Sequence, residues 1–138
     1  MNTMTAPFVQ KFEGNTAVVT AALTGIATST VTGAQLLATG GANGSMIVKL
    51  TAIPRATVTA ASLVLFLVKA GSPTVYQLID SELMAAYTLA ATTAIPETVF
   101  GNISWATPLT LGAGDMLYVG SQVALAAGIV FYAEQGNL

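Results

Sequence analysis

The chain has 138 residues, a formal net charge of −2, and neither cysteine nor histidine. Charged residues make up 7 % of it, whereas an average globular domain has about 25 %. The composition excludes disulfide bonds and thiolate metal sites, and it removes the commonest general base. With four basic residues, the chain cannot follow the phosphates of a nucleic acid, so we expect no nucleic-acid binding.

The first 13 residues precede the first clear apolar run and predict an N-terminal arm. Residues 3 to 7 are too poor in apolar side chains to fold alone. We expect Phe8, Val9 and Phe12 to dock on a neighbouring molecule, while residues 14 to 138 form a single domain. The segment has no basic start and no apolar stretch, so no signal peptide is expected.

Short apolar runs follow, separated by turns that contain glycine or proline, and this pattern is typical of strands. Residues 45 to 53 alternate with a period of two, as a half-buried strand does. We expect strands at 16–23, 45–53, 63–68, 75–79, 99–104, 116–121 and 129–133. Residues 25–32 predict a loop or an irregular edge strand, and 84–91 at most two helical turns. The sequence therefore predicts an all-β, jelly-roll-like antiparallel β-sandwich of about eight strands with little or no helix.

The most apolar run, residues 63 to 68, raises the question of a membrane span. Lys69 and the turn Gly71-Ser72-Pro73 stop it, and a span needs about 18 apolar residues. The uncharged stretch 116–133 is interrupted by Gly120 and Gly128. The run therefore predicts one strand of a hairpin, and no membrane association is expected.

This predicted strand is apolar on both faces. Leu63, Leu65 and Leu67 point to one side, and the alternate residues to the other. Because a sandwich buries only one face of each sheet, a loop, a terminal arm or another subunit must cover the second face. Few charges are available elsewhere to keep a monomer soluble, so we favour another subunit.

Few residues suggest a chemical site. Residues 40–44 predict a hairpin turn rather than a phosphate loop, because no Gly-Lys-Ser/Thr follows. Asp80 and Glu82 would share a strand face and could serve as an acid–base pair or as Ca²⁺ ligands. A solvated strand end explains them better, because no third carboxylate is near in sequence.

Trp105 is the one tryptophan. Facing solvent it would be a carbohydrate platform or an interface anchor, but we expect a core residue. No serine has a histidine or a suitable lysine beside it. We therefore expect no enzyme, no catalytic residue, no metal site and no cofactor.

Three segments carry a family resemblance: TGGANGSMIVKLTA (39–52), LVLFLVKAGSPTVYQLIDSEL (63–83), and PLTLGAGDMLYVGSQ (108–122) with GIVFYAEQGNL (128–138). They resemble the small jelly-roll proteins of tailed-bacteriophage heads. In that family a Gly-Ser turn opens a strand, a strand with a central Phe leads to a Leu-Ile-Asp/Glu strand, and Leu-x-Ala-Gly-Asp/Tyr-x-Leu opens the penultimate strand. The ending 134–138 departs from the family's Gly-Gly-Asp-Tyr.

The resemblance implies a virion protein, made in the host cytoplasm, that decorates the outer surface of a capsid. Such decoration (cement) proteins bind the shell of major capsid protein, usually as homotrimers. The alternative is a jelly-roll module of a head fibre or tail that binds a carbohydrate or a receptor. That alternative requires exposed aromatic side chains and polar loops, for which Trp105, Tyr76, Tyr87 and Tyr118 are the candidates.

Overall fold

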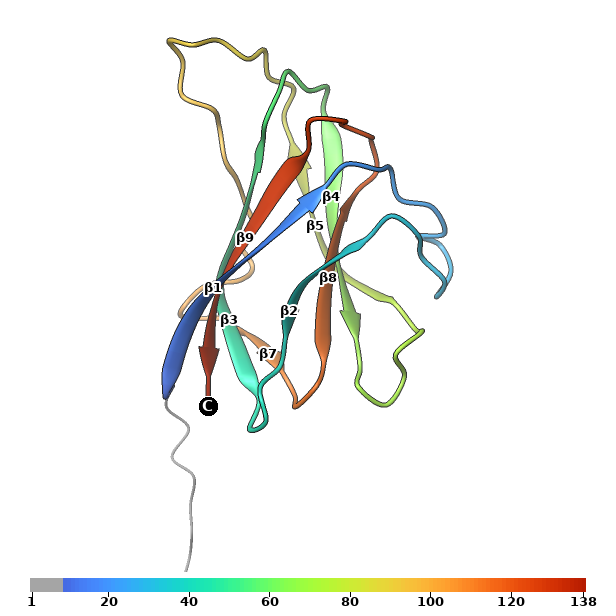
Figure 1. Cartoon of the computed structure of the whole chain (residues 1–138), viewed down its shortest axis with the longest axis vertical. Helices are drawn as coiled ribbons and strands as arrows, with labels where there is room; N and C mark the ends of the chain where they lie inside the picture. The colour runs from blue at the N-terminus through green and yellow to red at the C-terminus, as the bar shows by residue number, and fades with distance from the viewer. Residues whose placement is uncertain (1–8) are drawn as a thin grey trace, which may run out of the picture.

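A computed structural model describes residues 9 to 138, which form two antiparallel sheets packed as a sandwich (Figure 1). The described residues contain nine strands and no helix, which confirms the predicted all-β fold. The strands are β1 (Lys11–Val19), β2 (Gln35–Thr39), β3 (Ser45–Pro54), β4 (Ala61–Val68), β5 (Gln77–Met84), β6 (Thr98–Val99), β7 (Leu109–Leu111), β8 (Met116–Ser121) and β9 (Ile129–Asn137).

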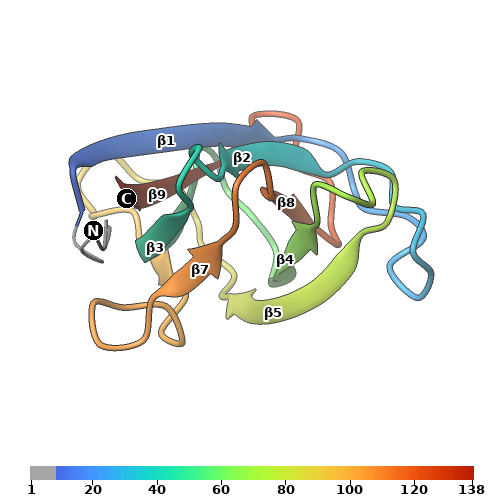
Figure 2. The same ribbon diagram turned by 90° about the horizontal axis from the view of Figure 1, so that it is seen from below.

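The strand pairing follows a jelly roll. One sheet has the order β1-β9-β3-β6, with β7 also on β3, and the other has the order β2-β8-β4-β5. Strand β1 pairs with β9, β2 with β8, β3 with both β6 and β7, and β4 with β5. If β6 and β7 count as one strand, this is the nested pairing of an eight-stranded jelly roll. The sheets close on each other where β1 and β2 lie side by side, and β5 lies away from β1 (Figure 2).

A loop of residues 100 to 108 interrupts the sixth strand of the roll. Thr98–Val99 and Leu109–Leu111 pair with successive parts of β3 in the same direction, so the chain leaves the sheet and returns to it. Phe100 and Ile103 are buried and fix the loop to the core. This insertion carries Trp105. The sequence predicted one strand over 99–104 and did not predict the insertion.

Strand β1 begins earlier than the sequence suggests. It pairs with β9 from Lys11↔Asn137 to Val19↔Ile129, so residues 11 to 13 belong to the sheet, and the predicted arm boundary after residue 13 is wrong. The polar stretch from Lys11 to Asn15 forms a strand because β9 supplies backbone partners along its whole length. Gln10 extends this pairing, since its N–H donates to the carbonyl of Asn137 at 2.8 Å.

The two inner sheet faces bury the main core. Leu63 and Leu65 of β4 are fully buried there, and so is Phe131 of β9, whose ring centroid lies 6.3 Å from that of Phe100. At roughly 25 cal/mol per Å² of apolar surface removed from water, each such side chain contributes about 2–3 kcal/mol. The inward residues of both sheets therefore supply most of the folding free energy.

The second face of β4 is covered by the same chain. Val64 and Phe66 are buried beneath Val31, Leu23 and Ile26 of the loop between β1 and β2. Phe66 also contacts the Tyr76 ring, edge to face at 6.1 Å. The predicted cover by another subunit is therefore wrong for this face. Residues 20 to 34 are rich in Thr, Ser and Ala, but they supply the apolar side chains that cover this face of β4.

The buried amide of Gln135 links four segments of the fold. Its Nε2 shares its two hydrogens among three acceptors, the Thr39 carbonyl at 2.8 Å, Ser45 Oγ at 3.0 Å and Asn137 Oδ1 at 2.9 Å. Its Oε1 accepts from Asn15 Nδ2 at 2.7 Å. Gln135 is 1 % exposed, and its polar atoms are satisfied as burial demands. The C-terminal residues that depart from the family ending thus form a structural hub.

The Asp115 carboxylate ties the β4–β5 hairpin to the start of β8. It accepts from Lys69 Nζ, from the Ala70 N–H at 3.0 Å and from the Gly112 N–H at 2.9 Å. The hydrogen bond from Lys69, followed by that from Ala70, lowers the pKa of the buried Asp115 carboxyl below its ordinary value. Because this pKa is depressed by folding, ionised Asp115 stabilises the native state above about pH 4, and that contribution is lost as pH falls through the folded pKa.

Asp115→Asn is therefore expected to reduce the free energy of unfolding by about 2 kcal/mol at pH 7, because the hydrogen bonds to a charged group are lost. The difference from wild type should shrink as pH falls below about 4. Urea unfolding between pH 7 and pH 2.5 measures it, with the exposed Glu97→Gln as the matched control. A difference that stays constant across this range would contradict a role for the ionised carboxylate.

Candidate functional site

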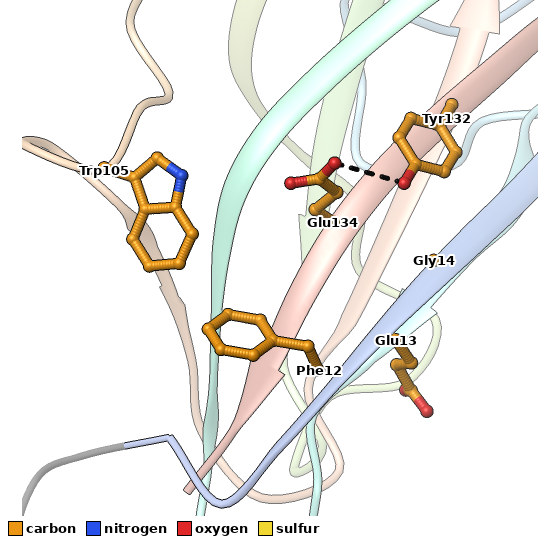
Figure 3. A pocket seen from close by; sticks show the side chains of 6 residues that line it. All are labelled: Phe12, Glu13, Gly14, Trp105, Tyr132 and Glu134. Atoms are coloured by element: carbon orange, nitrogen blue, oxygen red, sulfur yellow. Dashed lines mark hydrogen bonds between the residues drawn. The ribbon is translucent and has the colours of Figure 1, made fainter.

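An aromatic hollow of about 330 Å³ lies on the outer face of the β1-β9-β3 sheet (Figure 3). Six residues from three parts of the chain line it: Phe12, Glu13 and Gly14 of β1, Tyr132 and Glu134 of β9, and Trp105 of the loop between β6 and β7. Trp105 is 64 % exposed and Phe12 is 53 % exposed. The prediction that Trp105 belongs to the core is wrong, because the loop carries it away from the sandwich.

Two glycines make room for the rings on the sheet. Gly14 and Gly136 face outward on adjacent strands, and a Cβ atom at Gly14 would lie 3.0 Å from Tyr132 Cε1. A Cβ atom at Gly136 would meet Val9 Cγ2 at 2.6 Å and Phe12 Cε1 at 3.2 Å. The rings of Tyr132 and Phe12 therefore lie across these glycines, and Gly14 belongs to the lining of the hollow.

A turn holds Trp105 in place. The Ser104 N–H donates to the Thr107 carbonyl at 3.3 Å, and the Thr107 N–H donates to Ser104 Oγ at 3.2 Å. Thr107 Oγ1 also donates to the Asn102 carbonyl at 3.1 Å. Trp105 is thus a central residue of a hydrogen-bonded turn, and its ring packs on Phe12 with centroids 5.4 Å apart and planes tilted by 58°.

The polar side of the hollow is a tyrosine–glutamate pair. Tyr132 OH donates to Glu134 Oε1 at 3.2 Å. Burial and the charge of Glu134 raise the pKa of the Tyr132 hydroxyl above its ordinary value. Glu134 pairs in register with Lys49 of β3, an exposed residue. The lining can thus offer an aromatic apolar surface and hydrogen-bonding oxygens to a ligand.

A second exposed region lies along β5, the last strand of its sheet. We call the exposed side chains of Leu78, Ile79, Leu83 and Val99 the β5 edge surface. Leu83 and Val99 line one hollow of about 230 Å³ between β5 and β6, and Ile79 lines another of about 300 Å³ beside the loop 100–108. Exposed apolar side chains on an unpaired edge strand are unusual, because such edges aggregate unless they are covered.

Asp80 carries an unpaired oxygen in this region. Its Oδ1 accepts from the Ser81 N–H at 2.8 Å and from Asn102 Nδ2 at 3.3 Å, whereas its Oδ2 is buried and has no hydrogen-bond partner among the described residues. A buried polar atom without a partner is costly. Asp80 and Glu82 share a strand face, as predicted, and pair with Leu65 and Leu63 of β4.

The three predicted partner-contact residues have different outcomes. Phe8 lies outside the described residues, Val9 packs over Gly136, and Phe12 is an exposed member of the aromatic hollow. Sequence reasoning did not find Tyr132 and Glu134, although their spacing of two on one strand is a signal for a shared face. No group of three or more acidic side chains able to hold a metal ion occurs within residues 9 to 138.

Comparisons with known proteins identify no relative. No family model, no curated protein and no solved structure matches the chain. The described part of the chain also contains no helix with the length and hydrophobicity of a membrane span.

Proposed function

We propose that this protein is a structural component of a virion, which decorates and stabilises the outer surface of a bacteriophage capsid. In this proposal it assembles as a homotrimer and binds the major capsid protein. The jelly-roll fold and the family resemblance of residues 39–52, 63–83 and 108–138 support the class. The scarcity of charge supports it too, because 10 charged residues give few solubilising groups to a free monomer.

The β5 edge surface is the observation that carries this proposal. Leu83 and Val99 are 69 % and 56 % exposed, and they belong to edge strands of the two different sheets. A neighbouring copy that covers them would remove apolar surface from water and close the strand edge. Repeated in a closed ring, the same contact would leave no such edge free.

Asp80 gives this surface selectivity. Its unpaired Oδ2 and the nearby Glu82 disfavour indiscriminate strand addition, because inward charges at an edge protect it from aggregation. A partner that supplies a donor to Asp80 relieves the cost of the buried oxygen.

The outer face of β4 gives no support to a trimer, because residues of the same chain cover it.

Leu83→Glu is therefore expected to convert a trimer into a monomer, because the new carboxylate would be buried against a neighbour. Light scattering should give wild type a mass near three chains and the variant a mass near one. Leu89→Glu is the matched control, since Leu89 is also exposed, at 44 %, but lies in the loop after β5. It should stay trimeric.

The capsid role has its own measurement. Phage heads assembled without the protein should release their genome at a lower temperature than heads that carry it, because a ligand of the assembled shell stabilises that shell. Adding back wild type should restore the release temperature, and adding back Leu83→Glu should not. A monomeric wild type, or heads indifferent to the protein, would contradict the proposal.

A further inference from the structure

We propose that the aromatic hollow formed by Phe12, Trp105, Tyr132 and Glu134 is a binding site for a neutral saccharide, with room for about one pyranose ring. The volume, about 330 Å³, is at the small end of the range of about 300–1,000 Å³ for ligand pockets. This inference is independent of the capsid role, because the hollow lies on β1 and β9, whereas β5 belongs to the other sheet.

The apolar side of the hollow matches the flat face of a sugar ring. Phe12 and Trp105 pack against each other, with ring planes tilted by 58°, and together form the aromatic wall of the hollow (Figure 3). A pyranose presents a patch of C–H groups that packs on such a wall. Both rings are more than half exposed, although large aromatic side chains are among those that gain most from burial. A ligand that covers them recovers that gain.

The polar side matches the hydroxyl rim of the sugar. Glu134 accepts one hydrogen bond from Tyr132 and has further lone pairs for two hydroxyl donors. Tyr132 OH is held in place by that bond, so it is oriented before a ligand arrives. The turn at Ser104–Thr107 likewise fixes the backbone that carries Trp105. Preorganised groups lose little freedom on binding, which favours even a small ligand.

The local charges favour a neutral ligand over an ion. A cationic group would be attracted to the rings and to Glu134. Lys49, the cross-strand neighbour of Glu134, would repel that cation. An anion would be repelled by Glu134, which lines the hollow.

Trp105 is the chain's one tryptophan, so its fluorescence reports directly on the hollow. Titration with glucose, galactose, mannose and N-acetylglucosamine should give, for at least one of them, a saturable change in emission with a dissociation constant in the millimolar range. Phe12→Ala and Glu134→Gln should each weaken that binding about tenfold, since each removes a stacking or hydrogen-bonding contact. Glu97→Gln, an exposed carboxylate away from the hollow, is the matched control and should bind as wild type.

A saccharide array, read with labelled protein, extends the test to longer neutral glycans. Trp105→Ala should lose the array signal while its thermal unfolding stays within about 2 °C of wild type, because the exposed ring contributes little to the core. No saturable response to any sugar in either format would overturn the proposal. So would array binding that survives in Trp105→Ala, or a fluorescence response to tetramethylammonium that exceeds the response to every sugar.

Discussion

Phe66→Ala is expected to lower the free energy of unfolding by about 4 kcal/mol, which corresponds to a fall in melting temperature of about 12 °C. Phe66 is fully buried on the outer face of β4, where it contacts Tyr76 and the loop of residues 20 to 34. Its removal leaves a cavity that rigid neighbours on the sheet cannot fill. Thermal and urea unfolding measure the loss.

The dependence on protein concentration makes this prediction informative. Because the covering loop belongs to the same chain, the loss should be the same at low and high protein concentration. If a second subunit covered Phe66, the loss would appear in association and would vary with concentration. Phe12→Ala is the matched control, because Phe12 is 53 % exposed and should cost less than about 1 kcal/mol.

Much of the fold could be predicted from the sequence because its strongest strands are local patterns. The alternation in β3, the apolar run of β4 and the glycine turn before β8 each indicate a strand without reference to the rest of the chain. The predicted turn at residues 40–44 is also present, with Gly44 at φ 86° and its N–H bonded to the Gly41 carbonyl at 2.9 Å. Local chemistry suffices for such elements.

The missed elements depend on partners far away in sequence. Gln35–Thr39 becomes β2 because β8 pairs with it, and Lys11–Val19 extends five residues before the predicted start because β9 does. The aromatic hollow combines residues from β1, β9 and the loop 100–108. No local pattern places Trp105 beside Phe12, because that contact depends on the interruption between β6 and β7.

Gln135→Met is expected to destabilise the protein by about 3 kcal/mol, although methionine nearly preserves the volume. The substitution removes the Nε2 donor and the Oε1 acceptor, and it leaves the Thr39 carbonyl and Asn15 Nδ2 without their partner. Gln135→Ala should cost somewhat more, because it adds a cavity to the same loss. Gln122→Met, at an exposed position, should change stability by less than about 0.5 kcal/mol.

The network also predicts a coupling between its members. Asn15→Ala alone leaves Gln135 Oε1 without its donor, and Gln135→Met alone leaves Asn15 Nδ2 without its acceptor, so each single variant bears the cost of the other's orphaned group. The double variant should therefore lose about 1–2 kcal/mol less than the sum of the two single losses. Urea unfolding of all four proteins completes this cycle. Simple additivity would mean that Gln135 acts by packing alone, and β1 would then be held to β9 by backbone pairing without help from this hub.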